Sequence, residues 1–384
     1  MKPLTPRRWC TQVAGAMALL ALLLLISPGV GSELSSISWG DAWRARLGLT
    51  IEPSELTGRP LVDIDGNGVI TAEERDAFVR IARAIGFDQR FSRSLLALQV
   101  GATLGLCGAT FQILFRNVLA TPYTLGIASG GSLGALIALR AGWVAAFAGI
   151  SSTAIAAFAG ALVVVAAVFT FARGSRRLTS NEMLLAGVTL GLFCSAMMMF
   201  VTAVSSERET FFIVRWMMGS LDPIRGIEGA TLLPMLLPAW VGLVALSRAL
   251  NQYRLGDDWA AGRGVNVTAL QIGCVVLCSL ATAGVVAFCG PIGFVGLVVP
   301  HVVHLLFGSD TRILLPASAL FGAAFLVVCD WASQLSLRAA GWLMGKDLGS
   351  ATLPIGVVTA ILGVPVFLFL LRARTRRGHF TPGE

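Results

Sequence analysis

Long apolar runs recur along the chain and are separated by short polar segments. A helix needs about 17 to 25 mainly apolar residues to cross the hydrocarbon core of a bilayer, and about ten segments meet that requirement. The predicted spans are approximately 13–30, 94–115, 124–139, 143–171, 182–204, 230–250, 268–288, 292–307, 314–337 and 354–371. The pattern therefore predicts an all-α polytopic membrane protein with about ten transmembrane helices.

Composition supports this class and excludes soluble ones. Of the 384 residues, 55% are hydrophobic and 13% are charged, and the mean hydropathy is +0.78. A soluble domain has about a quarter of its residues charged, so a cytosolic enzyme, a secreted disulfide scaffold and a disordered chain are excluded. The net charge of +8 does not indicate nucleic acid, because Lys and Arg cluster at the ends of apolar runs.

The basic clusters also predict the orientation. If the runs alternate in direction, the clusters at 7–8, 116, 173–177, 248–263, 312 and 372–377 fall on one side. The positive-inside rule makes that side cytoplasmic, so both termini are expected in the cytoplasm. Lys2, Arg7 and Arg8 before the first run are also typical of a signal peptide, but we favour a retained helix.

The chain divides into four predicted parts. Residues 1–31 hold a cytoplasmic N-terminus and the first span, 32–91 form a small outer insertion, 92–372 hold the remaining spans, and 373–384 form a cytoplasmic tail. Small residues at helical spacing, such as Gly101 and Gly105, predict close helix packing within the bundle.

The insertion contains a candidate calcium loop. Residues 63–74 match the twelve-position EF-hand pattern. Ca²⁺ prefers six to eight oxygen ligands. The expected ligands are the side chains of Asp63, Asp65 and Asn67, the carbonyl of Val69, Thr71 directly or through water, and a bidentate Glu74. The alternative is an Asp- and Gly-rich turn that binds nothing; we expect Ca²⁺ as a structural cofactor rather than a switch.

The double substitution Asp63→Ala/Glu74→Ala is expected to loosen segment 32–91 and leave the spans intact, because only that segment contains the predicted ligands. Limited proteolysis with and without Ca²⁺ measures the effect. A wild-type protein whose protease sensitivity does not respond to Ca²⁺ would contradict the site.

Several ordered blocks begin at the end of the insertion and continue to residue 365. They are Arg90-Phe-Ser-Arg93 and residues 116–130, 185–187, 216–220, 255–267, 290–301 and 353–365. Together they resemble the permease subunits of the FecCD family, the bacterial ABC importers for iron–siderophore complexes, haem and cobalamin, over about three quarters of the chain. The resemblance implies ten helices per subunit, a second permease subunit, two ATP-binding subunits, a periplasmic binding protein and a place in the inner membrane.

The resemblance also implies roles for individual residues. The polar segment 249–268 is expected to be the coupling loop that meets an ATPase, through Leu255, Gly256, Asp257, Asp258, Arg263, Gly264, Val265 and Asn266. Arg90 and Arg93, and more weakly Arg338, are expected to dock the binding protein, with interfacial anchoring as the alternative. Structural or gating positions are Gly126, Gly130, Gly290, Pro291, Gly293, Pro300, His301, Pro354 and Gly356.

These features predict a permease and not an enzyme. The Gly345-Lys346 pair lacks a Gly at position 340, so no phosphate loop is present and ATP is expected to be hydrolysed by another polypeptide, with no nucleotide on this chain. The alternative is an ion-coupled secondary transporter or calcium-modulated channel, which needs several intramembrane ionisable groups, whereas Asp330 is nearly alone.

For His301 and His304 we favour a structural role over metal binding. The expected surroundings are membrane lipid and no nucleic acid.

Overall fold

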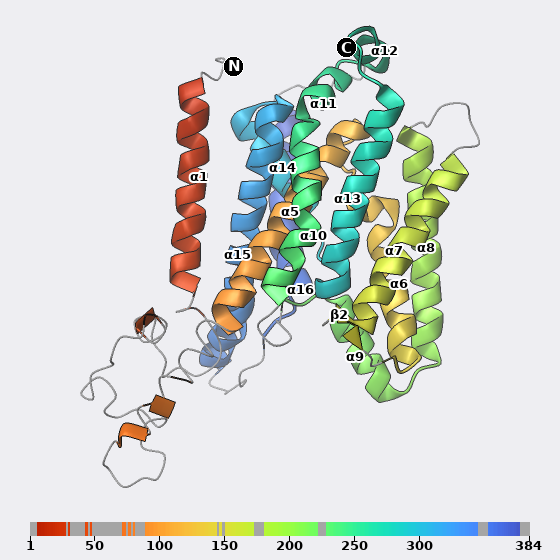
Figure 1. The fold of residues 1–384 in the computed structure, drawn as a ribbon. Helices are drawn as coiled ribbons and strands as arrows, with labels where there is room; N and C mark the ends of the chain where they lie inside the picture. The colour runs from red at the N-terminus through yellow and green to blue at the C-terminus, as the bar shows by residue number, and fades with distance from the viewer. Residues whose placement is uncertain are drawn as a thin grey trace.

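The computed structural model describes residues 6–27, 89–143, 146–147, 150–172, 180–221, 228–344 and 352–376, with isolated positions between 30 and 80. A helix overlaps each of the ten predicted runs (Figure 1). The longer helices are α1 (Pro6–Ile26), α5 (Ser92–Leu114), α6 (Ile127–Arg140), α7 (Ser152–Ala172), α8 (Ser180–Ala203), α10 (Glu228–Ala245), α13 (Val267–Cys289), α14 (Val295–Phe307), α15 (Thr311–Met344) and α16 (Ile355–Arg376). The shorter elements are η3 (Pro122–Leu125), α9 (Glu207–Met217), α11 (Ser247–Tyr253), α12 (Asp257–Gly262), β1 (Ala146–Phe147) and β2 (Ile150–Ser151).

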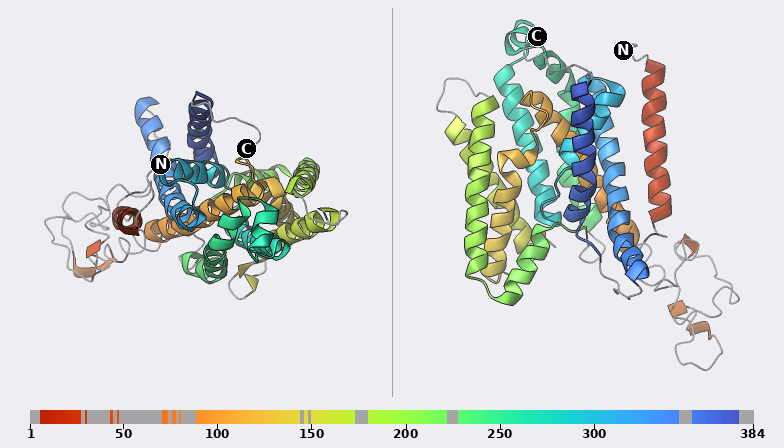
Figure 2. Two further views of the ribbon diagram at one scale, coloured as in Figure 1. Left: turned by 90° about the horizontal axis from the view of Figure 1, so that it is seen from above. Right: turned by 180° about the vertical axis from the view of Figure 1, so that it is seen from behind.

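The helical membrane class is confirmed, and the number of spans stays a prediction. Within the described part of the chain, five helices are long and apolar enough to cross a bilayer, or six if α10 and α11 form one bent span. Helix α6, α14, the apolar half of α1 and most of α16 are apolar but shorter. Helices α1 and α8 lie at opposite edges of the bundle, as both figures show (Figures 1 and 2).

Three local differences from the predicted runs have physical causes. The run 143–171 becomes helical only at Ser152, because β1 and β2 first form a short antiparallel hairpin with Phe147 opposite Ile150. The run 230–250 bends by 49° between α10 and α11. Helix α9 was not predicted, although Ser206 and Glu209 form a capping box: the Ser206 Oγ accepts from the Glu209 amide, and the Glu209 carboxylate accepts from the Ser206 amide.

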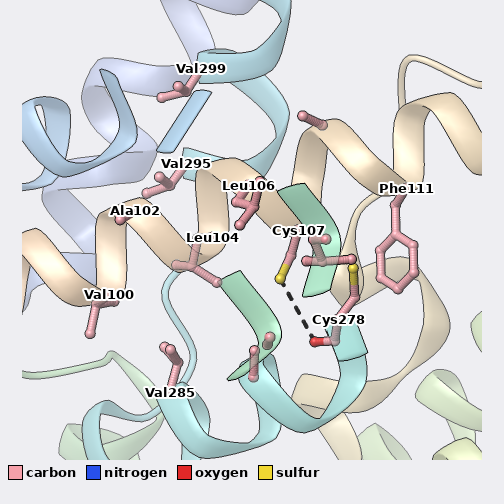
Figure 3. Packing of buried hydrophobic residues seen from close by; sticks show 14 of the residues in the cluster. Val100, Ala102, Leu104, Leu106, Cys107, Phe111, Cys278, Val285, Val295 and Val299 are labelled. Carbon is pink, nitrogen blue, oxygen red and sulfur yellow. Dashed lines mark hydrogen bonds between the residues drawn. The ribbon is translucent and has the colours of Figure 1, made fainter. Parts of the chain in front are cut away.

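Helix α5 forms the centre of the bundle. Eighteen of its 23 residues are buried. Figure 3 shows its side chains between Cys278 and Val285 of α13 on one side and Val295 and Val299 of α14 on the other. Apolar side chains alone do not hold membrane helices together, because lipid is equally apolar, so close packing must supply the attraction.

Glycines bring the backbones of α5, α14 and α15 into direct contact. A Cβ on Gly101 would lie 2.2 Å from the carbonyl oxygen of Gly322 in α15, and a Cβ on Gly108 would lie 2.0 Å from that of Gly296 in α14. A Cβ on Gly105 would lie 2.3 Å from the Ser318 carbonyl oxygen. The predicted close packing of small residues is therefore confirmed for this helix.

The two ends of the bundle differ. The Pro6 end of α1 and α12 lie at one end, and α9 with β2 lies at the other (Figure 1). We refer to these as the α12 end and the α9 end. At the α12 end, Arg116 contacts Asp257, Arg254 contacts Ser309, and Arg312 contacts Asp310. Three of the basic clusters expected on one side are therefore found together.

Substitution of Gly108 by Ala is expected to destabilise the protein by about 1–3 kcal/mol, because the new methyl group collides with the backbone of α14. Gly273→Ala is the matched control, since its Cβ would be 4.0 Å from its nearest neighbour, the Leu246 side chain. Thermal unfolding in detergent measures both. Equal melting temperatures for the two variants would contradict the role of backbone contact.

Candidate functional site

A short helix projects from the α12 end. The polar segment 249–268 contains α12, which begins after Gly256, whose φ is +132°. Leu255 and Trp259 are 64% and 63% exposed, and the Arg263 guanidinium lies 5.7 Å from the centre of the Trp259 ring. Leu255, which lies just before α12, and Trp259, which lies within it, are thus displayed beside charged side chains, an arrangement typical of a protein contact.

Two hydrogen bonds hold the chain that follows α12, one between backbone groups and one from a helix cap. Gly264 has φ +83°, and the Val265 amide donates to the Ala260 carbonyl at 3.0 Å. The Asn266 side chain caps α13 by accepting from the Ala269 amide at 3.0 Å. The eight residues predicted for ATPase coupling therefore form one continuous surface segment.

Arg116 connects this segment to the central helix. It directly follows the α5 C-cap, Phe115, and has φ +49°, a left-handed conformation that costs a non-glycine residue about 1 kcal/mol. Its Nη2 donates to the Tyr253 carbonyl at 2.9 Å and forms an ion pair with Asp257, and its guanidinium lies 4.7 Å from the Tyr253 ring centre. The Tyr253 hydroxyl in turn donates to the Leu114 carbonyl at 3.1 Å.

Other contacts fasten α11 to its neighbours. The Gln271 amide of α13 donates to the Tyr253 hydroxyl at 3.1 Å. The Thr311 hydroxyl of α15 donates to the Ser247 carbonyl at 2.5 Å, and Arg254 donates to the Ser309 carbonyl. Beside them, hydrogen bonds from Arg312 lower the pKa of Asp310. The segment 247–257 is therefore tied to α5, α13 and α15.

A second feature is a junction near the α9 end, where residues far apart in sequence meet. Gly290 has φ +68°, and a Cβ there would lie 2.5 Å from the Trp216 carbonyl oxygen of α9. The Gly356 amide of α16 donates to the Met218 carbonyl at 3.1 Å, and a Cβ on Gly219 would lie 2.7 Å from the Pro291 carbonyl oxygen. Three predicted structural positions, Gly290, Pro291 and Gly356, are thus brought together, and the end of α9 joins them.

The other predicted structural positions lie elsewhere. A Cβ on Gly126 would lie 2.9 Å from the Gly187 carbonyl oxygen, and one on Gly130 would lie 2.7 Å from that of Gly160. Gly293 has open space around its Cα, and Pro354 directly precedes α16. Pro300 lies inside α14, and buried His301 contacts the Phe367 ring edge-to-face at 6.2 Å.

His301 and His304 face a cavity of about 290 Å³ that Arg116 and Arg254 also line. Across the described residues, no three His, Cys, Asp or Glu side chains are grouped as metal ligands. The cavity lies beside the connection between α5 and α12.

A buried ion pair lies at the start of α5. Arg93 Nε donates to Asp330 Oδ1 at 2.6 Å, and Gln334 Nε2 donates to Asp330 Oδ2 at 2.8 Å. The side chain of Asp330 is fully buried and that of Arg93 is 11% exposed. Arg93 and Arg215 also line a cavity of about 270 Å³ between α9 and the residues before α16. Asp330, the carboxylate singled out in the sequence, is therefore paired.

The predicted docking arginines are placed only in part. Arg90 is buried, and Arg93 is held by Asp330. The side chain of Arg338 lies outside the described residues, as do the calcium-loop residues Asp63, Asp65, Asn67, Val69 and Glu74; Thr71 is described and exposed. Docking and calcium binding therefore stay predictions.

Known proteins match this chain over most of its length. The model of the FecCD transport family matches residues 19–373. The cobalamin import system permease protein BtuC of Halobacterium salinarum is 36% identical over 95% of this chain and 96% of its own. The ABC transporter permease YvrB of Bacillus subtilis is 38% identical over 76% of this chain and 79% of its own. The vitamin B12 import permease BtuC of Salmonella paratyphi A is 37% identical over 75% and 83%.

The fold matches as well. A solved ABC transporter in an inward-facing conformation superposes with a TM-score of 0.71 at 25% identity, covering 95% of this chain and 99% of that one. The fold and the apolar bundle define a polytopic transport permease. The chain belongs to the FecCD transport family, and it is a membrane subunit of a transporter rather than an enzyme.

Several contacts at these sites are not predictable from the sequence pattern. Arg116 was noted only as part of a family block and as a basic residue, and its contacts to Tyr253 and Asp257 join residues 137 and 141 positions apart. Arg215 of α9 lines the cavity with Arg93. The capping box at Ser206 was the signal that would have located α9.

Asp330→Ala is expected to destabilise the protein by roughly 3–5 kcal/mol, because it leaves the Arg93 guanidinium buried without its partner. The double variant Arg93→Met/Asp330→Leu is expected to recover part of that loss, since neither charge remains. Thermal unfolding in detergent compares them. A double variant that melts below Asp330→Ala would show that the pair is not the source of the loss.

Proposed function

We propose that this chain is the permease subunit of an ATP-driven importer that moves a metal chelate or cobalamin-type molecule from the periplasm into the cytoplasm. Family membership and relatives named as cobalamin import permeases support the class of cargo. The single observation that carries the mechanism is α12, an exposed helix fastened to the central helix through Arg116 and Tyr253.

The proposed partners are those that the family resemblance implies, and the geometry of α12 supports one of them. Trp259 and Leu255 offer an apolar contact to a soluble ATP-binding subunit, and the charges of Asp258 and Arg263 beside them set its orientation. The basic residues at the same end support a cytoplasmic α12 by the positive-inside rule, and α9 is then expected to face the periplasm if the chain lies in the inner membrane. Two ATP-binding subunits, a second permease subunit and a periplasmic binding protein complete the proposed complex.

The ion-coupled alternative fits the structure less well. A carboxylate that carries a proton or cation must be able to lose its partner during each cycle. Asp330 receives hydrogen bonds from both Arg93 and Gln334 in a fully buried position. This arrangement favours a structural pair over a mobile ion site.

The outer insertion at 32–91 remains a proposed module of its own. Its loop at 63–74 carries the oxygen ligands of an EF-hand, and a single hand outside the membrane is expected to bind Ca²⁺ with Kd on the order of 10⁻⁴–10⁻³ M. The insertion contains Arg90 and ends directly before α5, so calcium would stiffen the chain that leads into the central helix.

Uptake of labelled ferric siderophore, haem and cobalamin in a strain deleted for this gene tests the proposal. Loss of one uptake that the wild-type chain restores identifies the cargo. Asp257→Ala/Asp258→Ala is expected to restore at most about a tenth of it, because α12 would no longer couple to the ATPase.

Asp310→Ala is the matched control, because Asp310 lies at the same end and outside α12. It should restore uptake. No change in any uptake on deletion, with no paralogue present, would contradict the proposed function.

A further inference from the structure

Arg116 lies at the point where the centre of the bundle meets the surface segment. It follows α5 directly, and its guanidinium reaches the Tyr253 carbonyl, the Tyr253 ring and Asp257, the first residue of α12. Its left-handed backbone turns the chain away from α5 while the side chain reaches across to α12.

Tyr253, the last residue of α11, attaches the segment before α12 to α5 and α13. Its side chain is buried, its hydroxyl donates to the Leu114 carbonyl in the last turn of α5, and it accepts from Gln271 of α13. The Arg116–Asp257 ion pair therefore joins the end of α5 to the start of α12, whereas the Tyr253 contacts join the end of α5 to α11, which precedes α12 in the chain. A shift of α12 away from α5 breaks the ion pair.

The packing of helix α5 allows a displacement of this helix to move its neighbours α14 and α15. Its glycines leave no gap between its backbone and those of α14 and α15. Closely packed interiors change between discrete arrangements and do not deform smoothly, so a shift of α5 requires its neighbours to shift with it. A displacement of α12 that moves α5 is therefore expected to move α14 and α15 as well.

We propose that Arg116 is a positioning residue that holds α12 against the end of α5, so that a movement imposed on α12 by the ATP-binding subunit moves α5. The transmission of movement from the ATP-binding subunit rests on the proposed function, whereas the attachment of α12 to α5 by Arg116 does not. A lysine keeps the charge but lacks the planar fork that meets Tyr253 and Asp257 together, so it performs this role only in part.

The opposing interpretation is an ordinary surface ion pair. The side chains of Arg116 and Asp257 are 45% and 46% exposed, and exposed pairs generally contribute little to stability. Under that interpretation, the loss of either side chain would change neither the coupling of transport to ATP hydrolysis nor the protection of the α12 amides from hydrogen exchange. The two interpretations therefore differ in measurable ways.

The test uses the complete complex in proteoliposomes and measures the number of chelate molecules transported per ATP hydrolysed. Arg116→Asn suits the left-handed backbone and removes the guanidinium. This ratio is expected to fall about tenfold in Arg116→Asn and in Asp257→Asn, and no further in the double variant, because both break one connection. The ratio for Arg116→Lys is expected to lie between the ratios of these variants and that of the wild type.

Arg312→Gln is the matched control, since Arg312 forms an ion pair with Asp310 at the same end without joining α5 to α12. Its ratio should match that of the wild type. Additive losses in the double variant, or a normal ratio with only a lower yield of complex, would overturn the proposal.

Hydrogen exchange on the purified chain gives a readout that does not need transport. The amides of α12 are expected to exchange faster in Arg116→Asn than in the wild type or Arg312→Gln, because α12 loses its hold on α5. Unchanged exchange would overturn the proposal. If the wild-type complex imports no chelate, the proposed function fails, and the exchange of α12 still decides the role of Arg116.

Discussion

Direct backbone contact between α5 and its neighbours is the constraint on which the rest of the structure depends. Gly101, Gly105 and Gly108 let α5 touch α14 and α15 at distances that no other residue type permits. In a bilayer, where burial of apolar side chains supplies little attraction between helices, this closeness supplies much of the packing energy. Because the backbones touch, α5 has no free space in which to move without also moving α14 and α15.

The two ends of α5 carry the charged contacts that relate this core to function. At the start of the helix, Arg93 pairs with Asp330 of α15 and lines a cavity beside α9. Just beyond its last turn, Arg116 pairs with Asp257 of α12. One rigid helix therefore runs from the face where cargo is expected to arrive to the face where the ATPase is expected to bind. This arrangement is consistent with a permease that couples events on opposite sides of a membrane.

Periodicity and composition were sufficient to predict the membrane class and the location of the helices. They also located α12, because a short polar segment between two apolar runs stands out. They did not place the breaks: hairpin β1–β2 lies inside an apolar run, and α9 is too short and too amphipathic to register as a span. Its signal was local capping chemistry at Ser206 and Glu209.

Contacts between distant residues were not predictable from the pattern. Asp330 was recognised as an unusual carboxylate, but its partner Arg93 lies 237 positions away. The junction of Gly219, Gly290 and Gly356 likewise depends on how three elements meet. Residue type and spacing describe each element alone, whereas these contacts depend on the arrangement of whole helices.

The most direct test of the central claim is the energy source for transport. The permease is reconstituted with its ATP-binding subunits and binding protein, and uptake of the identified chelate is followed with ATP as the only energy source and then with ion gradients alone. Uptake that requires ATP and persists when ionophores remove every gradient is the result we predict. Uptake driven by an ion gradient without ATP would contradict the account, because α12 would then have no ATPase to follow.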